Sequence, residues 1–403
     1  MSEWRHPRAA DWRQTEGTSK LEAMTRPLED LIPEYLRGLP VYVPGKPIEE
    51  VERELNIRAI KLASNENPLG PSPKAVEAVR GALPESHRYP DGGTNVLREK
   101  LAKLRGVQFE EIFIGLGSSE IIDLAARVFL RFGIAGLTSE GSYAPFSTAI
   151  RASGAALHLA KQRDFAFDLR AIGEAITPET RLIYLANPNN PTGTAFGAAE
   201  LEQFLERVPQ NILVVLDEAY IHYAARADMP DSAALFRAHK NLLTLRTFSK
   251  VYGLAGLRIG YATATSGLVA AMNKLRTPFN TSGLAQAAAI AALDDDAHVK
   301  RSLETNAAER LRLHNALRDL GLQPVPSEAN FIFVELGAIA KDFSDVLLRG
   351  GVIVRPLGWM GFPDAIRVSV GTAQENDAFL QAMRELWPNA SRATAAPAQR
   401  TAG

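Results

Sequence analysis

Apolar runs of strand length alternate with amphipathic segments through the middle of the chain. The segment EEIFIGLG (110–117) leads into SSEIIDLAARVFLRF (118–132), whose apolar residues recur at the spacing of a helix. Further strand candidates are RLIYLA (181–186), NILVVLDEAY (211–220), NLLTLR (241–246) and LRIGYATA (257–264). Continuous apolar strands joined by helices are typical of a parallel sheet covered on both faces. The pattern therefore predicts an α/β fold with a mainly parallel central sheet.

The pattern changes after residue 292. A long charged segment (298–321) is typical of a helix, and the strand candidates NFIFVEL (330–336), VIVRPL (352–357) and IRVSVG (366–371) follow it. One helical segment, AKDFSDVLLRGG (340–351), lies among them. This order predicts a small α+β domain.

These changes suggest a division of the chain. We expect a large domain over residues 86–291, and a small domain over residues 292–388 to which residues 36–85 return. Residues 1–35 are polar and mixed, which predicts an N-terminal extension. Residues 389–403 are small and polar without a period, which predicts a flexible tail.

Composition excludes several classes of protein. The net charge of −1 gives no general attraction to nucleic acid or membranes, so neither partner is expected. The absence of cysteine excludes disulfides, thiolate metal sites and a thiol nucleophile, and the seven histidines show no ligand-type spacing, so no metal is expected. Neither a signal peptide nor a run of about 18 apolar residues is present, which favours a soluble cytoplasmic protein.

Polar motifs stand where the predicted strands end, and in parallel sheets ligands bind beyond those ends. GLGSSE (115–120) opens a helix and suits an anion, although Ser118 or Ser119 could also serve as an ordinary N-cap. NPNNPTG (187–193) forms a turn from which Asn190 could donate to a ligand oxygen.

Two further motifs place ionisable groups at strand ends. In LDEAY (216–220), Asp217 follows an apolar run, where a carboxylate is costly unless paired, although it could also cap a helix. In TFSKVYGLAGLRIG (247–260), Lys250 stands among hydroxyls and near Arg258, a combination that suits a phosphate. A desolvated lysine near other cations has a lowered pKa and can attack a carbonyl.

Together the motifs supply an amine, a carboxylate, an amide with a phenol, and a phosphate cradle. Pyridoxal phosphate requires these groups. TFSKVYGLAGLRIG, NPNNPTG, LDEAY and NENPLGPSP (65–73) also resemble the corresponding motifs of fold-type-I aminotransferases, and more narrowly those of histidinol-phosphate aminotransferases. The resemblance covers residues 35–388 and implies a homodimer with shared active sites.

The resemblance assigns cofactor-binding roles by position. Lys250 would carry the cofactor, Asp217 would pair with its ring nitrogen, and Asn190 and Tyr220 would bond its ring oxygen. Tyr143 would stack on the ring, although ordinary packing is the simpler interpretation of this tyrosine alone. The residues implied at the phosphate are Ser118, Ser119, Thr247, Ser249, Arg258 and, from the neighbouring subunit, Tyr89.

The resemblance also assigns the substrate side. Arg367 matches the arginine that binds the substrate anion. Arg355, at the end of a parallel strand candidate, matches a second anion contact, although it could equally be surface charge. Asn67 and Asn330 would line the side of the small domain. The chain departs from the usual pattern at Leu116 and Ser119, where many relatives have an asparagine and an acid, and at Ser142, where a proline is common.

The implied reaction is transamination of L-histidinol phosphate with 2-oxoglutarate, giving imidazole-acetol phosphate and glutamate in histidine biosynthesis. An arginine fork would also bind the carboxylate of phenylalanine or tyrosine, so an aromatic amino-acid aminotransferase is the alternative. A decarboxylase of an amino-acid phosphate is more remote. A non-catalytic, cofactor-binding regulator is a further alternative, but the segment before the fold shows no helix-turn-helix with a basic face.

Overall fold

The computed structural model describes residues 27–41 and 45–395, with side chains to residue 387. The chain forms two units, residues 1–40 and 41–403. The first unit contains two short turns of helix, η1 (Leu28–Leu31) and α2 (Glu34–Arg37). The second contains every other described element. Within the described ranges, no helix combines the length and the apolar character needed to span a membrane.

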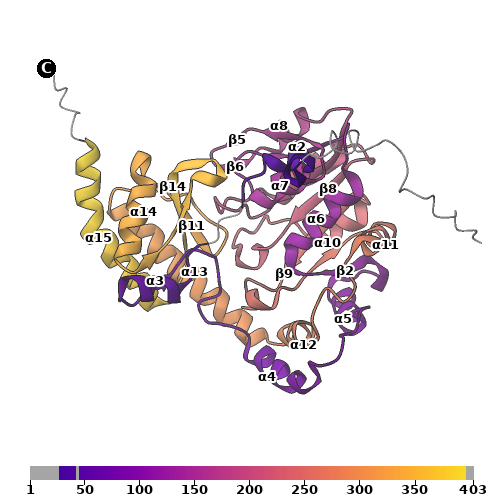
Figure 1. Ribbon diagram of the computed structural model, residues 1–403, viewed down its shortest axis with the longest axis horizontal. Helices are drawn as coiled ribbons and strands as arrows, with labels where there is room; N and C mark the ends of the chain where they lie inside the picture. The colour runs from indigo at the N-terminus through magenta and orange to yellow at the C-terminus, as the bar shows by residue number, and fades with distance from the viewer. Residues whose placement is uncertain (1–26, 42–44, 396–403) are drawn as a thin grey trace, which may run out of the picture. The chain divides into compact units, whose positions relative to one another are not determined.

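A seven-stranded sheet forms the centre of the second unit (Figure 1). Its strands, in spatial order, are β2 (Ile112–Gly115), β10 (Gly260–Thr263), β9 (Leu242–Thr247), β8 (Leu213–Asp217), β7 (Thr180–Ala186), β3 (Ala135–Ser139) and β4 (Ala156–Ala160). β10 runs antiparallel to both of its neighbours, and the other pairs are parallel. The prediction of an α/β fold with a mainly parallel central sheet is therefore confirmed.

Helices cover both faces of this sheet because its strands are apolar on both sides. Along β2, Phe113 belongs to one apolar cluster and Ile112 and Ile114 to another, as the alternation of strand side chains requires. The first cluster contains side chains of α6 (Gly117–Phe129), α7 (Ala144–Ala152), α8 (Leu169–Glu174), α9 (Ala198–Arg207), α10 (Ser232–Ala238) and α11 (Ser266–Leu275). The second contains side chains of α4 (Pro73–Ala82), α5 (Asn95–Arg105) and α12 (Gly283–Ala292).

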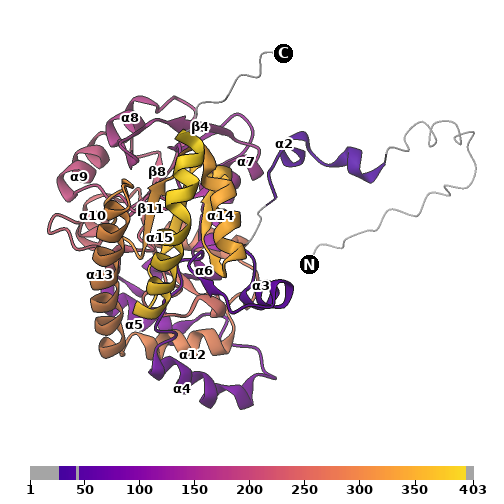
Figure 2. The same cartoon turned by 90° about the vertical axis from the view of Figure 1, so that its left-hand side faces the viewer.

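The C-terminal part builds a smaller sheet with its own apolar cluster. Its antiparallel strands are, in order, β11 (Phe331–Glu335), β14 (Phe362–Ser369) and β13 (Arg355–Leu357). Figure 1 shows β11 and β14 on the left with α13 (Asp296–Asp319), α14 (Ala340–Arg349) and α15 (Ala373–Ala395), and Figure 2 shows these helices from the front. The short strand β1 (Ile60–Lys61) runs parallel to β12 (Val352–Ile353) beside them.

The remaining elements are short connections. They are α3 (Ile48–Leu55), β5 (Gln162–Arg163), β6 (Ala166–Phe167), η2 (Leu83–Glu85), η3 (Phe109–Glu111), η4 (Ile221–Tyr223), η5 (Ala255–Leu257), η6 (Gly337–Ile339) and η7 (Gly358–Met360).

The structure differs from the sequence expectations in three places. Residues 389–395, expected in a flexible tail, continue α15 beyond Pro388, which lacks the N–H for one helical hydrogen bond but does not end the helix. The parallel strand expected before Arg355 is β12, which ends at Ile353, and Arg355 itself begins the antiparallel strand β13. Within residues 36–85, β1 joins the C-terminal strands but Ala75 of α4 packs in the cluster of α5 and α12. The division into a large and a small domain at the predicted boundaries remains a proposal.

Candidate active site

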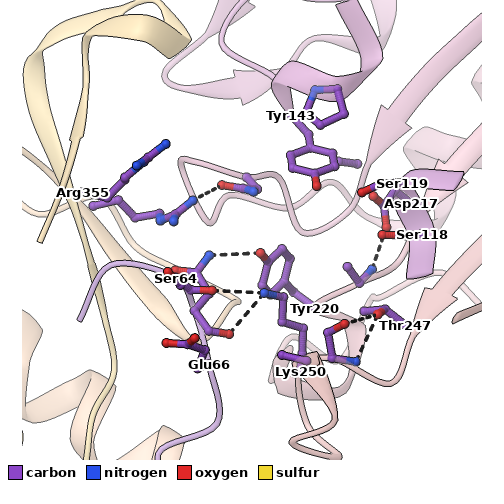
Figure 3. A pocket seen from close by; sticks show the side chains of 18 of the residues that line it. Ser64, Glu66, Ser118, Ser119, Tyr143, Asp217, Tyr220, Thr247, Lys250 and Arg355 are labelled. Carbon is purple, nitrogen blue, oxygen red and sulfur yellow. Dashed lines mark hydrogen bonds between the residues drawn. The ribbon is translucent and has the colours of Figure 1, made fainter. Parts of the chain in front are cut away.

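A cavity of about 440 Å³ opens beyond the carboxyl ends of β7, β8 and β9 (Figure 3). Its wall contains residues that are far apart in the sequence, because the C-terminal strands β13 and β14 contribute to it as well. Of the residues predicted from the sequence, the cavity is lined by Ser118, Ser119, Tyr143, Asn190, Asp217, Tyr220, Thr247, Ser249, Lys250, Arg258, Arg355 and Arg367.

Lys250 follows β9 and is held at the cavity wall by backbone carbonyl groups. Its Nζ donates to the carbonyl oxygens of Ser64, at 3.3 Å, and Asn65, at 3.2 Å. Burial lowers the pKa of this amine to about 7, and the nearby Arg367 adds to the effect. A large share of the amine is therefore neutral and nucleophilic near neutral pH. Figure 3 shows Lys250 beside the ring of Tyr220, and the ring centroid lies 5.4 Å from Nζ.

Asp217 ends β8 and is almost fully buried, with 4% of its surface exposed. In register it lies between Ala186 of β7 and Leu245 of β9, which fixes it at the centre of the sheet edge. Burial raises its pKa to about 7, although the Ala219 N–H donates to Oδ1 at 2.9 Å. A buried carboxylate in this position is suited to a cationic ligand group, because such a partner would offset its desolvation.

The N-terminus of α6 forms one end of the cavity. Ser118 and Ser119 lie in the first turn of the helix, where backbone N–H groups have no intrahelical acceptor. These amides and the helix dipole suit an anion. Gly117 has a φ of +73°, and a Cβ there would lie 2.6 Å from Nη2 of Arg258. The glycine thus allows a guanidinium group to lie against the helix N-terminus.

Hydroxyl groups complete this anion-binding end. Thr247 Oγ1 donates to Ser249 Oγ at 2.9 Å and accepts the Ser249 N–H at 3.1 Å. Arg258 Nη1 lies 3.4 Å from Ser249 Oγ and 3.0 Å from the carbonyl oxygen of Ala255. Two hydroxyls, a guanidinium group and helix amides are the donors that a phosphate group requires.

The middle of the cavity contains the phenol, amide and aromatic groups. The hydroxyl of Tyr220 is bonded to Asn65, and the side-chain oxygen of Asn190 accepts from Nη1 of Arg367 at 2.5 Å. Tyr143 immediately precedes α7 and contacts Phe146 edge to face, with ring centroids 5.6 Å apart. Figure 3 shows the Tyr143 ring on the same side of the cavity as Asp217 and Ser119.

Arg355 and Arg367 lie directly opposite each other on the neighbouring strands β13 and β14. They are 8% and 7% exposed, so the interpretation of Arg355 as surface charge is wrong. Nη2 of Arg367 donates to the carbonyl oxygen of Ala63 at 2.8 Å, and the Arg355 guanidinium carbon lies 4.8 Å from the ring centroid of Trp359. Two cations therefore share one wall of the cavity.

Three predicted residues do not line the cavity. Tyr89 is 83% exposed and stacks on Phe279, with centroids 4.7 Å apart. Asn67 lies behind the wall, where its Nδ2 donates to the carbonyl oxygen of Val251 at 2.8 Å. Asn330 also lies behind the wall and donates to the carbonyl oxygen of Asn65 at 3.1 Å.

The sequence analysis missed several residues of the wall, notably Ser64, Asn65, Glu66, Trp359 and Met360. The motif NENPLGPSP was recognised, but its first asparagine, Asn65, lines the cavity and its second, Asn67, does not. Asn65 has a left-handed backbone conformation with a φ of +54°, which could not be predicted from the amino-acid sequence.

The residues present fit pyridoxal phosphate at each of its groups. The cavity brings together a partly neutral lysine, a buried carboxylate, a phenol with an amide, and an anion-binding helix end. Independent support comes from the family model of aminotransferases of class I and II, which matches residues 57–383. The chain belongs to this family: it is an aminotransferase, and pyridoxal phosphate is its cofactor.

Within this class, the chain is similar to histidinol-phosphate aminotransferases. It is 48% identical to histidinol-phosphate aminotransferase 2 of Pseudomonas aeruginosa, over 86% of this chain and 95% of that protein. It is 45% identical to the histidinol-phosphate aminotransferase of Moorella thermoacetica, over 88% and 92%. The crystal structure of the Sinorhizobium meliloti enzyme in complex with pyridoxal-5'-phosphate superposes with a TM-score of 0.82 at 32% identity, covering 89% of this chain and 97% of that one.

Proposed function

We propose that the protein transfers the amino group of L-histidinol phosphate to 2-oxoglutarate, giving imidazole-acetol phosphate and glutamate in histidine biosynthesis. The observation that carries the proposal is the pair of arginines in the cavity wall, Arg355 and Arg367, which face each other across two antiparallel strands. The names of the similar enzymes point to the same substrate.

The arginine pair favours a doubly charged anion. Like charges directly opposite each other on neighbouring strands destabilise a sheet. A phosphate carries about −1.5 to −2 charges near pH 7 and three strong acceptor oxygens, so it would offset both guanidinium groups. A carboxylate carries one charge and offsets less. The same pair can still bind a carboxylate of glutamate in the second half of the reaction, because the guanidinium fork fits either anion.

Each residue of the cavity has a role in this reaction. When bound, the cofactor supplies an electron sink for the bond that breaks at the substrate carbon. Lys250, with its pKa near 7, can accept and return the proton at that carbon. Asp217 stabilises a positive charge on the ring nitrogen, and Tyr220 with Asn190 bonds the ring oxygen. Arg367, held by Asn190 and the Ala63 carbonyl, orients the substrate anion.

A homodimer with shared sites belongs to the same proposal. Tyr89 is exposed, and it stacks on Phe279, which is itself 45% exposed. Two exposed aromatic rings in contact suit an interface rather than a solvated surface. In the dimer we expect Tyr89 of one protomer to reach the cofactor phosphate of its partner.

The test compares kcat/KM for histidinol phosphate and for phenylalanine, both with 2-oxoglutarate, on one preparation. A site built to bond the phosphate should favour histidinol phosphate by roughly 10⁴, since buried donors otherwise go unpaired. Comparable values, or a preference for phenylalanine, would replace this proposal with an aromatic amino-acid aminotransferase. Lys250→Ala is the control and should abolish turnover with every donor; an intact kcat would exclude the mechanism.

A further inference from the structure

We propose that Asn65 is a positioning residue for this reaction. Its side-chain amide directs the hydroxyl hydrogen of Tyr220 towards the cofactor. Its backbone links Lys250 by hydrogen bonds to β14, the strand that carries Arg367. The inference rests on the transamination proposed above, but it holds for either amino donor.

Asn65 connects four residues around the cavity. It is 1% exposed. Its N–H donates to Ser369 Oγ at 2.8 Å, Ser369 Oγ donates to its Oδ1 at 3.0 Å, and its Nδ2 donates to the hydroxyl oxygen of Tyr220 at 3.0 Å. Its carbonyl oxygen accepts from Lys250 at 3.2 Å and from Asn330 at 3.1 Å. A buried side chain with this many partners has a fixed orientation.

The network also fixes which way the amide faces. Because Ser369 Oγ already accepts the backbone N–H of Asn65, its own hydrogen is available for Oδ1. The NH₂ group then faces Tyr220. With the opposite orientation, the Ser369 hydroxyl hydrogen would lose this acceptor inside the protein, which is unfavourable.

The direction of the Asn65–Tyr220 bond matters for the reaction. Since the phenol oxygen accepts from Asn65, the hydrogen of the phenol is free to donate to another group. The cavity lies on that side of Tyr220, and the ring oxygen of the cofactor would be the acceptor. An acceptor in place of the amide would capture this hydrogen and leave the ring oxygen without it.

The backbone of Asn65 narrows the choice of residue further. Its φ of +54° lies in the left-handed region, which glycine, asparagine and aspartate adopt with little strain. This turn aims the carbonyl oxygens of Ser64 and Asn65 at Nζ of Lys250. Just before the turn, the Ala63 carbonyl accepts from Arg367. One short segment therefore bonds the amine, the phenol and the substrate arginine.

Two substitutions separate these roles. Asn65→Gly keeps the left-handed backbone and the backbone hydrogen bonds, and removes the side-chain amide with its bonds to Tyr220 and Ser369. Asn65→Asp keeps the shape and the bond from Ser369 but presents an acceptor to the phenol. Asn56→Gly is the matched control, because Asn56 is an exposed asparagine that also has a left-handed backbone, with a φ of +52°.

The readouts are the pH titration of the cofactor absorbance band, the thermal midpoint of the cofactor-free protein, and kcat/KM with the donor that the wild type prefers. We expect Asn65→Gly to move the midpoint of the absorbance titration and to lower kcat/KM about tenfold, as for one hydrogen bond. Asn65→Asp should lower it by about 100-fold, because a buried charge is added to the lost bond. Asn56→Gly should match the wild type in all three measurements.

A double-mutant cycle tests whether the effect passes through Tyr220. In the Tyr220→Phe background, the further loss caused by Asn65→Gly should fall from about tenfold to less than twofold, because the amide has no phenol left to orient. The inference would be overturned if the losses of kcat/KM in the two single variants multiplied fully in the double variant. It would also be overturned if Asn65→Gly had the absorbance titration and the kcat/KM of the wild type. Because the losses are measured with whichever donor the wild type uses, a failure of the histidinol phosphate proposal is a separate result.

Discussion

Replacing Asp217 with asparagine should stabilise the cofactor-free protein at alkaline pH, although it lowers the catalytic activity of the enzyme. The folded protein raises the pKa of this carboxyl from 3.8 to about 7, chiefly through burial. An acid with a raised pKa binds its proton more tightly when folded than when unfolded. Its contribution to stability is therefore neutral below about pH 4 and becomes increasingly unfavourable up to about pH 7.

The size of the effect follows from the pKa. Moving a carboxyl pKa from 3.8 to about 7 disfavours the ionised form by about 4 kcal/mol, at roughly 1.4 kcal/mol per pH unit. Between pH 5 and pH 8 the wild type should lose about 3 kcal/mol relative to Asp217→Asn. With an unfolding entropy of about 2 cal/mol/K per residue, this corresponds to about 3–4 °C in the thermal midpoint for a chain of this size.

The assay is thermal unfolding of both cofactor-free proteins at pH 5 and pH 8. Lys250 also titrates abnormally, with a pKa lowered to about 7, so its stability contribution decreases as the pH falls from about 10 to 7. Comparing the two proteins at each pH removes this effect except for its dependence on Asp217, whose charge is the smallest of the causes that shift the pKa of Lys250. The control is Asp342→Asn, which changes an exposed carboxylate on α14. If the difference between wild type and Asp217→Asn is the same at both pH values, the carboxylate is not destabilised by burial and the reasoning fails.

Two other substitutions test the two ends of the cavity. Arg367→Lys should lower kcat/KM about 10–100-fold for both the phosphate and the carboxylate substrates, because an ammonium group cannot reproduce the paired bonds to Asn190 and Ala63. Steady-state kinetics that match the wild type would contradict this role of Arg367. Gly260→Ala would place a Cβ 3.1 Å from the backbone nitrogen of Ser118. This substitution should weaken cofactor binding at least tenfold, and it should lower the free energy of unfolding by about 1–3 kcal/mol. Its control is Gly256→Ala, where no atom lies within 4 Å; equal cofactor affinity in the two variants would show that the first turn of α6 tolerates the added methyl group.

The sheet could be predicted where a strand is a continuous apolar run. β7, β8 and β9 are buried along nearly all of their length, and their sequences show it directly. β3 was missed because AGLTS, although buried throughout, contains glycine, serine and threonine and has no apolar run. The antiparallel direction of β10 could not be predicted, because burial on both faces gives the same pattern whichever way the neighbouring strands run.

The cofactor side of the site could be predicted because each of its groups follows an apolar strand. Polar residues occupy positions where the packing of the core does not require them, at Asp217, Lys250 and the serines of α6. A catalytic or ligand-binding role explains their presence there. Asn65 could not be separated from Asn67 in this way. Both precede the same proline within a few residues, and only the left-handed turn decides which of the two faces the cavity.

The substrate side depends on strand register, which the sequence does not contain. Arg355 and Arg367 are twelve positions apart. Taken alone, Arg355 could equally be surface charge, whereas Arg367 opens an alternating strand candidate, where surface charge is a poor explanation. Register places them opposite each other on β13 and β14, and burial prevents solvent from screening them. The guanidinium group of Arg367 donates to the side-chain oxygen of Asn190 and to the carbonyl oxygen of Ala63. Two guanidinium groups side by side would favour a ligand with more than one negative charge, and for this reason the proposed amino donor is a phosphate ester rather than a simple amino acid.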